Sequence, residues 1–220
     1  MLTLLPTPIG NIEDITLRTL RVLEEAEILL CEDTRVTKKL INLLQERHGL
    51  KHKIEKFISI HSHNEERVVN SFEPSFFEKN VVYMSDAGMP CISDPGAILV
   101  EYCQKHQIPY TVLPGPSAAV TAYAASGFNE KEFLFYGFLP HKGAQRAREL
   151  KRLLLEPFPV ILYEAPHRIE KLFAEISAIE PQREVFAAKE ITKRHERFFK
   201  DEAKELERKI RGTLAKGEWV

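Results

Sequence analysis

Residues 31–35, CEDTR, place a carboxylate two positions before an arginine at the end of an apolar run. At such a position the carboxylate of Asp33 can accept a proton from a substrate hydroxyl, and Arg35 can orient that hydroxyl. The structural alternative is that Asp33 or Thr34 caps the following helix while Arg35 pairs with a neighbouring acid. The residues alone do not decide between the two interpretations.

Two segments in the second half of the chain have a similar character. YEAPHR, residues 163–168, places Glu164 at the end of an apolar run and Arg168 just after a proline. KEITKRHE, residues 189–196, is the strongest local basic patch, although a solvated hairpin turn is the default explanation for it. Its chemically useful side chains are Lys189, Glu190, Lys193, Arg194 and His195.

The longest turn-rich segment is SDAGMPCISDPG, residues 85–96. Asp86 follows an apolar strand and offers a carboxylate acceptor, while Gly88 allows a backbone to approach a ligand closely. The structural alternative is a rigid connection in which Asp94 caps the helix that begins near Gly96. A second loop, PGPSAA, lets Ser117 and the first N–H groups of a helix hold polar ligand atoms, or merely lets small residues pack that helix tightly.

Several familiar sites are absent from the sequence. No G-x-G pair, G-K-[ST] or G-x-S-x-G occurs, so the Rossmann fingerprint, the P-loop and the nucleophile elbow are excluded. His61 and His63 share a strand face but have no matching ligands nearby, so we expect no metal site. The cysteines, Cys31, Cys91 and Cys103, are too far apart for C-x-x-C and suggest a reducing cytoplasm.

These loops require a scaffold of alternating strands and helices. Apolar runs such as LTLL, EILLC, VVYMS and PYTVLP alternate with amphipathic stretches such as DITLRTLRVLEEA and RVTKKLINLLQERH. This pattern predicts an α/β fold with a mainly parallel sheet covered on both faces. Ligands bind outside the carboxyl ends of such strands, where the loops PTPIGN, SDAGMPCISDPG and PGPSAA can converge.

A polar turn near residue 127 divides the chain into two predicted domains, 1–127 and 128–220. In the second, REVFAAKEI and HERFFK predict an antiparallel pair and hence a mixed sheet. Residues 1–140 carry 13 basic and 18 acidic side chains, and the remainder carries 18 and 14, so only the second half suits a polyanion. The final KGEWV predicts a strand shorter than usual, so either the chain ends on a short edge strand or a longer protein is truncated there.

Composition narrows the class of protein further. With 220 residues and 44% hydrophobic content, the chain can build real cores, and its net charge of −1 gives no overall preference for nucleic acid. No apolar run is long enough for a membrane span and the N-terminus lacks a signal-peptide pattern, so we expect a cytoplasmic protein without membrane contact.

The motifs PTPIGN, CEDTR, SDAGMPCISDPG, PGPSA, GFLP, YEAPHR, KEITKRHE and KGEWV, in this order, resemble the tetrapyrrole methylase superfamily. Within it they are most similar to the branch that methylates small-subunit ribosomal RNA. The resemblance implies S-adenosyl-L-methionine as cofactor, bound in a cleft between two α/β domains of a homodimer. It also implies 2'-O-methylation of a cytidine ribose of 16S rRNA in the decoding centre of the small ribosomal subunit.

The resemblance also suggests site residues. The expected cofactor contacts are Pro8, Ile9, Asp86, Gly88, Met89, Ser117, Ala118, Tyr163, Glu164 and Ala165. The candidate general bases are Asp33, Glu164 and Glu190, and the candidate RNA contacts are Arg35, Arg168, Lys189, Lys193 and Arg194. The competing functions are methylation of a corrin precursor or another tetrapyrrole, and non-catalytic RNA binding in ribosome assembly.

Overall fold

The computed structural model describes residues 1–220, which form two compact units, Met1–Ser117 and Ala118–Val220. The division lies ten residues before the predicted boundary at 127/128. The difference is the helix α5 (Ala118–Ser126), which packs against two strands of the second unit, β7 (Val160–Tyr163) and β8 (Glu184–Lys189). The two units are described separately below.

The first unit is a five-stranded parallel sheet in the order β3-β2-β4-β1-β5, as the alternating pattern predicted. Its strands are β1 (Leu2–Leu5), β2 (Ile28–Cys31), β3 (Lys56–Ser59), β4 (Val81–Met84) and β5 (Tyr110–Val112). Its helices are α1 (Leu17–Glu25), α2 (Thr34–His48), α3 (Glu65–Val69) and α4 (Ala97–Lys105), with 3-10 turns η1 (Ile12–Asp14) and η2 (Pro74–Glu78).

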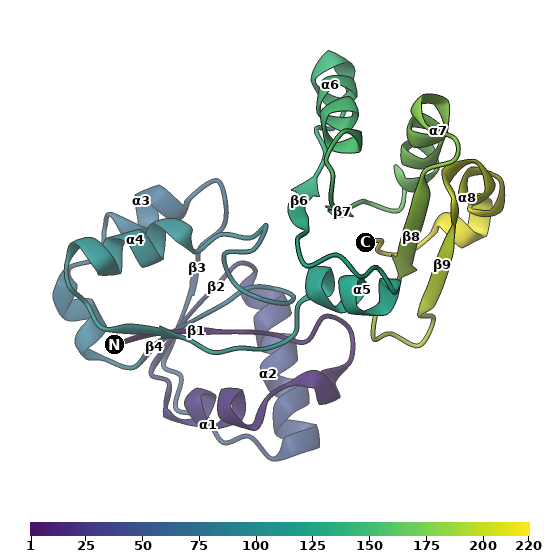
Figure 1. The fold of residues 1–220 in the computed structure, drawn as a ribbon. Helices are drawn as coiled ribbons and strands as arrows, with labels where there is room; N and C mark the ends of the chain where they lie inside the picture. The colour runs from purple at the N-terminus through teal and green to yellow at the C-terminus, as the bar shows by residue number, and fades with distance from the viewer. The chain divides into compact units, whose positions relative to one another are not determined.

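Helices cover both faces of this sheet, α1 and α2 on one face and α3 and α4 on the other (Figure 1). Successive side chains of a strand point to opposite faces, so each central strand contributes to two cores. In β2, Leu30 packs in the cluster with Leu99 of α4, whereas Leu29 packs with Leu23 of α1. Burial on both faces explains the uninterrupted apolar runs in the sequence.

The second unit combines helices with two short sheets. Besides α5, β7 and β8, it contains β6 (Leu134–Phe138), α6 (Gly143–Leu154), α7 (Ile169–Ile179), β9 (Arg197–Glu202), α8 (Ala203–Lys209) and the 3-10 turn η3 (Gly212–Ala215). β6 and β7 pair in parallel, and β8 and β9 pair antiparallel. The predicted mixture of strand directions is therefore present, but as two separate pairs. Trp219 forms isolated bridges with Glu164, just after β7, and with Lys189 of β8.

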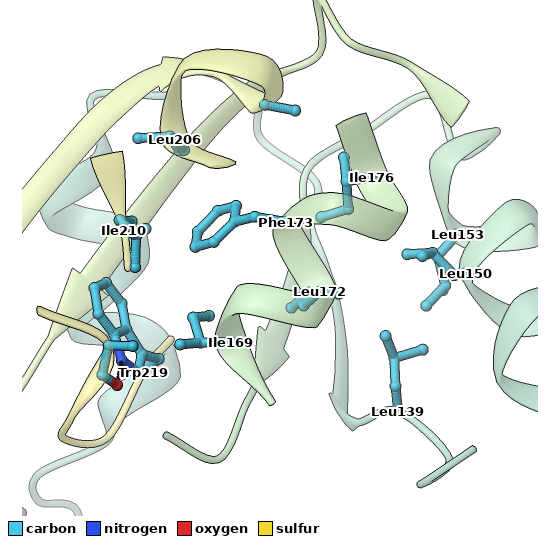
Figure 2. Close-up of a cluster of buried hydrophobic side chains, with 13 residues drawn as sticks. Leu139, Leu150, Leu153, Ile169, Leu172, Phe173, Ile176, Leu206, Ile210 and Trp219 are labelled. Carbon is cyan, nitrogen blue, oxygen red and sulfur yellow. Dashed lines mark hydrogen bonds between the residues drawn. The ribbon is translucent and has the colours of Figure 1, made fainter. Parts of the chain in front are cut away.

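The core of the second unit surrounds α7 (Figure 2). Phe173 lies on the side of Leu206 and Ile210, while Leu150 and Leu153 of α6 lie on the opposite side of α7. An apolar cavity of about 410 Å³ adjoins this core, lined by residues of α5, β7, α7 and β8. None of the helices in the chain combines the length and the apolar character that crossing a membrane requires.

Candidate functional site

In the first unit, the loops that follow β1 and β4 are joined by backbone hydrogen bonds. The N–H of Thr7 donates to the carbonyl of Gly88 at 2.9 Å, and the N–H of Gly88 donates back to Thr7 at 3.1 Å. The hydroxyl of Ser85 also donates to the Gly88 carbonyl at 3.2 Å. The predicted cofactor residues Pro8, Ile9, Asp86, Gly88 and Met89 therefore lie on two loops that are fixed to each other.

Two glycines let the loops approach closely. Gly88 has φ +82°, and a Cβ there would lie 3.3 Å from Cγ2 of Ile9 and 3.7 Å from the carbonyl oxygen of Pro116. A Cβ on Gly115 would lie 2.3 Å from Cγ of Pro6. The loop after β5, which contains Ser117, thus packs on the loops after β1 and β4. The structure brings together the three strand-end loops whose convergence the sequence suggested.

Three carboxylates, those of Glu32, Asp86 and Asp94, interact electrostatically at this edge of the sheet. Burial raises the pKa of each, and the effect is largest for Asp94, whose pKa rises to about 7 through burial and the charges of Glu32 and Asp86. The site therefore contains an acid that exchanges its proton near neutral pH.

Asp33, a predicted base, is held differently. Its Oδ1 accepts the N–H of Arg35 at 2.8 Å and so caps α2, while its Oδ2 lies 2.7 Å from Nη2 of Arg35. Hydrogen bonds from Arg35 lower the pKa of Asp33 to about 2. A carboxylate with so low a pKa is a weak proton acceptor, so the geometry favours the capping interpretation.

Glu164, the second predicted base, lies in a buried ion network of the second unit. Its Oε2 accepts Nη2 of Arg146 at 3.0 Å, and Nε of Arg168 lies 2.7 Å from its Oε1. The side chains of Glu164 and Arg146 are 2% and 1% exposed. Nε of Arg146 also donates to Glu175 at 2.8 Å. The carboxylate is enclosed by its own partners, which argues against a role as base.

The same network accounts for Arg168, a predicted RNA contact. Arg168 is buried beside Glu164, and its Nη1 has no hydrogen-bond partner. A guanidinium in this position is not accessible to a phosphate. The structure therefore gives Arg168 an internal role, which argues against the predicted RNA contact.

The KEITKRHE segment is tied to the final residues of the chain. Lys189 is buried and its Nζ donates to the carbonyl of Leu214 at 2.8 Å, and Lys193 donates to Glu190 at 3.1 Å and to Glu218 at 2.8 Å. Although burial by itself would raise the pKa of Glu190, hydrogen bonds from Glu218 and Lys193 lower it below its ordinary value. Lys189 is thus inaccessible to RNA, and Glu190 is a weak base.

The other predicted residues have simpler surroundings. Arg35 and Arg194 are exposed, and Lys193 is half-buried. The hydroxyl of Tyr163 accepts the N–H of Ala119 at 3.2 Å, and the N–H of Ala165 donates to Glu164 at 2.9 Å. The second unit therefore offers fewer free cations than its sequence suggested.

The family model described as Tetrapyrrole (Corrin/Porphyrin) Methylases matches residues 1–207 of the chain. The chain belongs to the tetrapyrrole methylase family. The predicted family is confirmed, and membership makes the chain a methyltransferase.

Relatives that match the chain over all or nearly all of its length carry the name ribosomal RNA small subunit methyltransferase I. The Campylobacter fetus protein is 49% identical over 220 residues, and the Helicobacter pylori J99 protein is 45% identical over 233 residues; each match covers 100% of this chain and 81% of the relative. The Thermotoga maritima protein is 42% identical, covering 93% of this chain and 89% of its own. The predicted similarity to this branch of the family is thereby confirmed.

Solved structures agree on the fold. Uroporphyrin-III C-methyl transferase from Thermus thermophilus, complexed with S-adenyl homocysteine, has a TM-score of 0.66 at 17% identity, covering 99% of this chain and 95% of that one. The cobalt precorrin-4 methyltransferase CbiF has a TM-score of 0.65 at 19% identity, covering 99% and 92%. At such identities the likeness concerns the fold alone, and it confirms the α/β methylase architecture.

Sequence reasoning considered Asp94 only as a possible helix cap and did not include it among the candidate bases. Arg146 lies on a helix rich in basic residues, yet its side chain is buried. The available signal for Asp94 was its place on the same loop as Asp86, near a third acid, Glu32, because the charges of Glu32 and Asp86 add to burial in raising the pKa of Asp94.

Proposed function

We propose that this methyltransferase transfers a methyl group from S-adenosyl-L-methionine to the ribose 2'-hydroxyl of a cytidine in 16S rRNA, in the decoding centre of the small ribosomal subunit. The observation that carries the proposal is the match of the whole chain, at 45% to 49% identity, to relatives named for methylating small-subunit rRNA. A tetrapyrrole substrate is supported by the general description of the family and by structures at 16% to 19% identity, a much weaker similarity.

The strand-end loops of the first unit suit the proposed cofactor. S-adenosyl-L-methionine carries a positively charged sulfonium and an ammonium group. The carboxylates of Glu32, Asp86 and Asp94 supply negative charge near these groups, and their oxygens can accept hydrogen bonds from hydroxyl groups of the ligand. When bound, it supplies an electrophilic methyl group. The residues that would hold it here are Pro8, Ile9, Asp86, Gly88, Met89 and Ser117. Contacts from Ala118, Tyr163, Glu164 and Ala165 of the second unit stay predictions.

The proposed general base is Asp94 rather than Asp33, Glu164 or Glu190. A base works best when its pKa lies near the working pH, and that of Asp94 is about 7. Asp94 is half-buried at the end of the loop that also carries Asp86. Positioning supplies the larger part of the acceleration, because the sulfonium is already a good leaving group.

The proposed RNA contacts are now only those predicted arginine and lysine side chains that solvent can reach. Arg35 and Arg194 are exposed, and Lys193 retains partial exposure beside Glu190 and Glu218. The excess of basic over acidic residues after residue 140 supports the second half as the polyanion-facing part.

The proposal includes a cytoplasmic homodimer, as the family resemblance implies. All three cysteines are free thiols in the structure, in keeping with a reducing compartment. Light scattering of the purified protein measures its mass directly, and a monomer at working concentrations would exclude the dimer.

The decisive experiment supplies labelled S-adenosyl-L-methionine to three substrates: small ribosomal subunits from cells lacking this enzyme, naked 16S rRNA and a uroporphyrinogen. We expect the label in the rRNA, at the ribose of one cytidine. A label on the ribose should remain in the RNA when the nucleobase is cleaved from that nucleotide. Label in the tetrapyrrole alone would replace the proposed substrate. Binding to subunits with neither cofactor binding nor transfer would instead indicate a non-catalytic assembly factor.

A further inference from the structure

The segment His61–Glu65, which follows β3, has no part in the proposed chemistry. It is anchored firmly to the sheet: the side chain of Asn64 accepts the N–H of His61 at 2.8 Å and donates to the carbonyl of Ser59 at 3.1 Å. Ser59, in turn, donates its hydroxyl to the carbonyl of Glu32 at 2.8 Å. The segment is thus fixed to the ends of β2 and β3.

Glu65, which follows Asn64, contacts a helix that is distant in the sequence. It is 7% exposed, and its Oε1 accepts three backbone N–H groups at the start of α4: Gly96 at 2.8 Å, Ile98 at 3.1 Å and Leu99 at 3.4 Å. These donors have no partner within the helix, and a carboxylate at a helix N-terminus is favoured by both the hydrogen bonds and the helix dipole. Glu65 therefore caps the N-terminus of α4, the role that the structural alternative gave to Asp94.

The turn before α4 is tightly packed around this contact. The hydroxyl of Tyr83 donates to the carbonyl of Pro95 at 2.8 Å, and the N–H of Cys91 donates to the same carbonyl at 3.2 Å. A Cβ on Gly96, which has φ +126°, would lie 2.7 Å from both Sγ of Cys91 and Cε1 of Tyr83. The backbone from residue 91 to residue 96 has no room to shift without losing these contacts.

We propose that Glu65 is a positioning residue of the cofactor site: by binding the start of α4 it fixes the C-terminal end of the Ser85–Gly96 loop. The N-terminal end of that loop is fixed by β4 and by the Thr7–Gly88 hydrogen bonds. Held at both ends, the loop keeps Asp86, Met89 and Asp94 in one arrangement before the ligand arrives, so less ordering entropy is lost on binding. This inference rests on the proposed function, because it takes the loop to be part of the cofactor site.

The test compares S-adenosylhomocysteine binding by calorimetry to the full chain and four variants. Glu65→Ala removes the acceptor and Glu65→Gln keeps an oxygen but loses the charge. Glu66→Gln alters the exposed neighbour on the same helix. Leu44→Ala opens a cavity in the core on the other face of the sheet, and so lowers stability without touching the loop.

We expect the Kd to rise about tenfold in Glu65→Ala, equivalent to about 1.4 kcal/mol. The rise should be smaller in Glu65→Gln and absent in Glu66→Gln and Leu44→Ala. A purely structural role would lower the melting temperature of Glu65→Ala and Leu44→Ala alike but leave the Kd of the folded molecules unchanged. Equal Kd values in Glu65→Ala and Leu44→Ala would overturn the inference.

Hydrogen exchange of the ligand-free proteins provides a second measurement, should Glu65→Ala fail to fold. The amides of Gly96, Ile98 and Leu99 should exchange faster in Glu65→Gln than in Glu66→Gln, and equal rates would contradict the role of Glu65. If the unaltered protein binds no S-adenosylhomocysteine or S-adenosyl-L-methionine, the proposed function fails, and the cofactor role of Glu65 fails with it. A failure of the inference alone instead leaves binding intact in every variant.

Discussion

Replacing Glu164 should destabilise the second unit strongly, because its carboxylate is the common partner of two buried guanidinium groups. Arg146 lies 3.0 Å from one oxygen and Arg168 lies 2.7 Å from the other. In Glu164→Ala, Arg168 loses its only ion-pair partner, whereas Arg146 keeps Glu175 at 2.8 Å and the carbonyl of Pro140 at 3.2 Å. One buried cation is then left without compensation.

The magnitude follows from that inventory. Breaking a buried ion pair by removing one partner costs about 3 to 5 kcal/mol, and the lower end applies here because Arg146 retains a carboxylate. Glu164→Gln keeps the shape and one acceptor oxygen, so we expect a loss of about 1 to 2 kcal/mol. Arg208→Gln breaks an exposed pair with Glu205 in the same unit and should change the free energy of unfolding by about 0.5 kcal/mol or less.

Urea unfolding measures these differences conveniently, because the chain has one tryptophan, Trp219, buried in the core of the second unit. Its fluorescence reports the unfolding of this unit. A loss below about 1 kcal/mol in Glu164→Ala would refute the reasoning, since typical buried pairs cost more. Normal stability of Glu164→Gln together with abolished methyl transfer would return Glu164 to the role of general base.

Three further outcomes are expected. Burial raises the pKa of Asp94 to about 7, so the folded protein retains a proton that the unfolded chain releases near pH 4, and stability falls as the pH rises from 4 through 7. As the pH rises from 5 to 8, the free energy of unfolding of Asp94→Asn, measured in urea titrations, should therefore increase by about 1 to 2 kcal/mol relative to that of the unaltered protein, after discounting for solvent screening. The variant should also lose the rise of the methyl-transfer rate with pH. Stability curves of the two proteins that stay parallel across this pH range would contradict the prediction. Gly115→Ala places a Cβ 2.3 Å from Cγ of Pro6 and should cost about 1 to 3 kcal/mol, visible as a lower melting temperature; an unchanged value would show that the loops separate easily. Replacing Arg35 and Arg194 with Gln should reduce the log–log salt slope of rRNA binding by about 0.7 to 0.9 per lost phosphate contact, and an unchanged slope would remove both from the interface.

Regular structure and its strand-end loops were predictable from local patterns. The apolar runs LTLL, ILLC and VVYM became strands buried on both faces, and amphipathic segments such as Thr34–His48 became the helices that cover them. Both patterns act over a few residues, because side chains alternate along a strand and repeat every 3.6 residues along a helix. The motifs that mark the family are short continuous segments, so the sequence alone also identified the chemistry.

Side-chain roles depended on segments far apart in the chain, which no local pattern reveals. Asp94 lies three residues before α4, the helix for which it was a candidate cap, yet the cap is Glu65, 31 residues away from Gly96. Arg146 lies on a helix whose sequence is rich in basic residues, yet its side chain is buried and donates hydrogen bonds to Glu164 and Glu175. The burial of a side chain and the compensation of its charge depend on all the groups that the fold places within a few ångströms of it, wherever they lie in the sequence. Local sequence patterns therefore specify the elements and loops of this protein, whereas the packing of distant segments sets which of their charged groups remain accessible to a substrate.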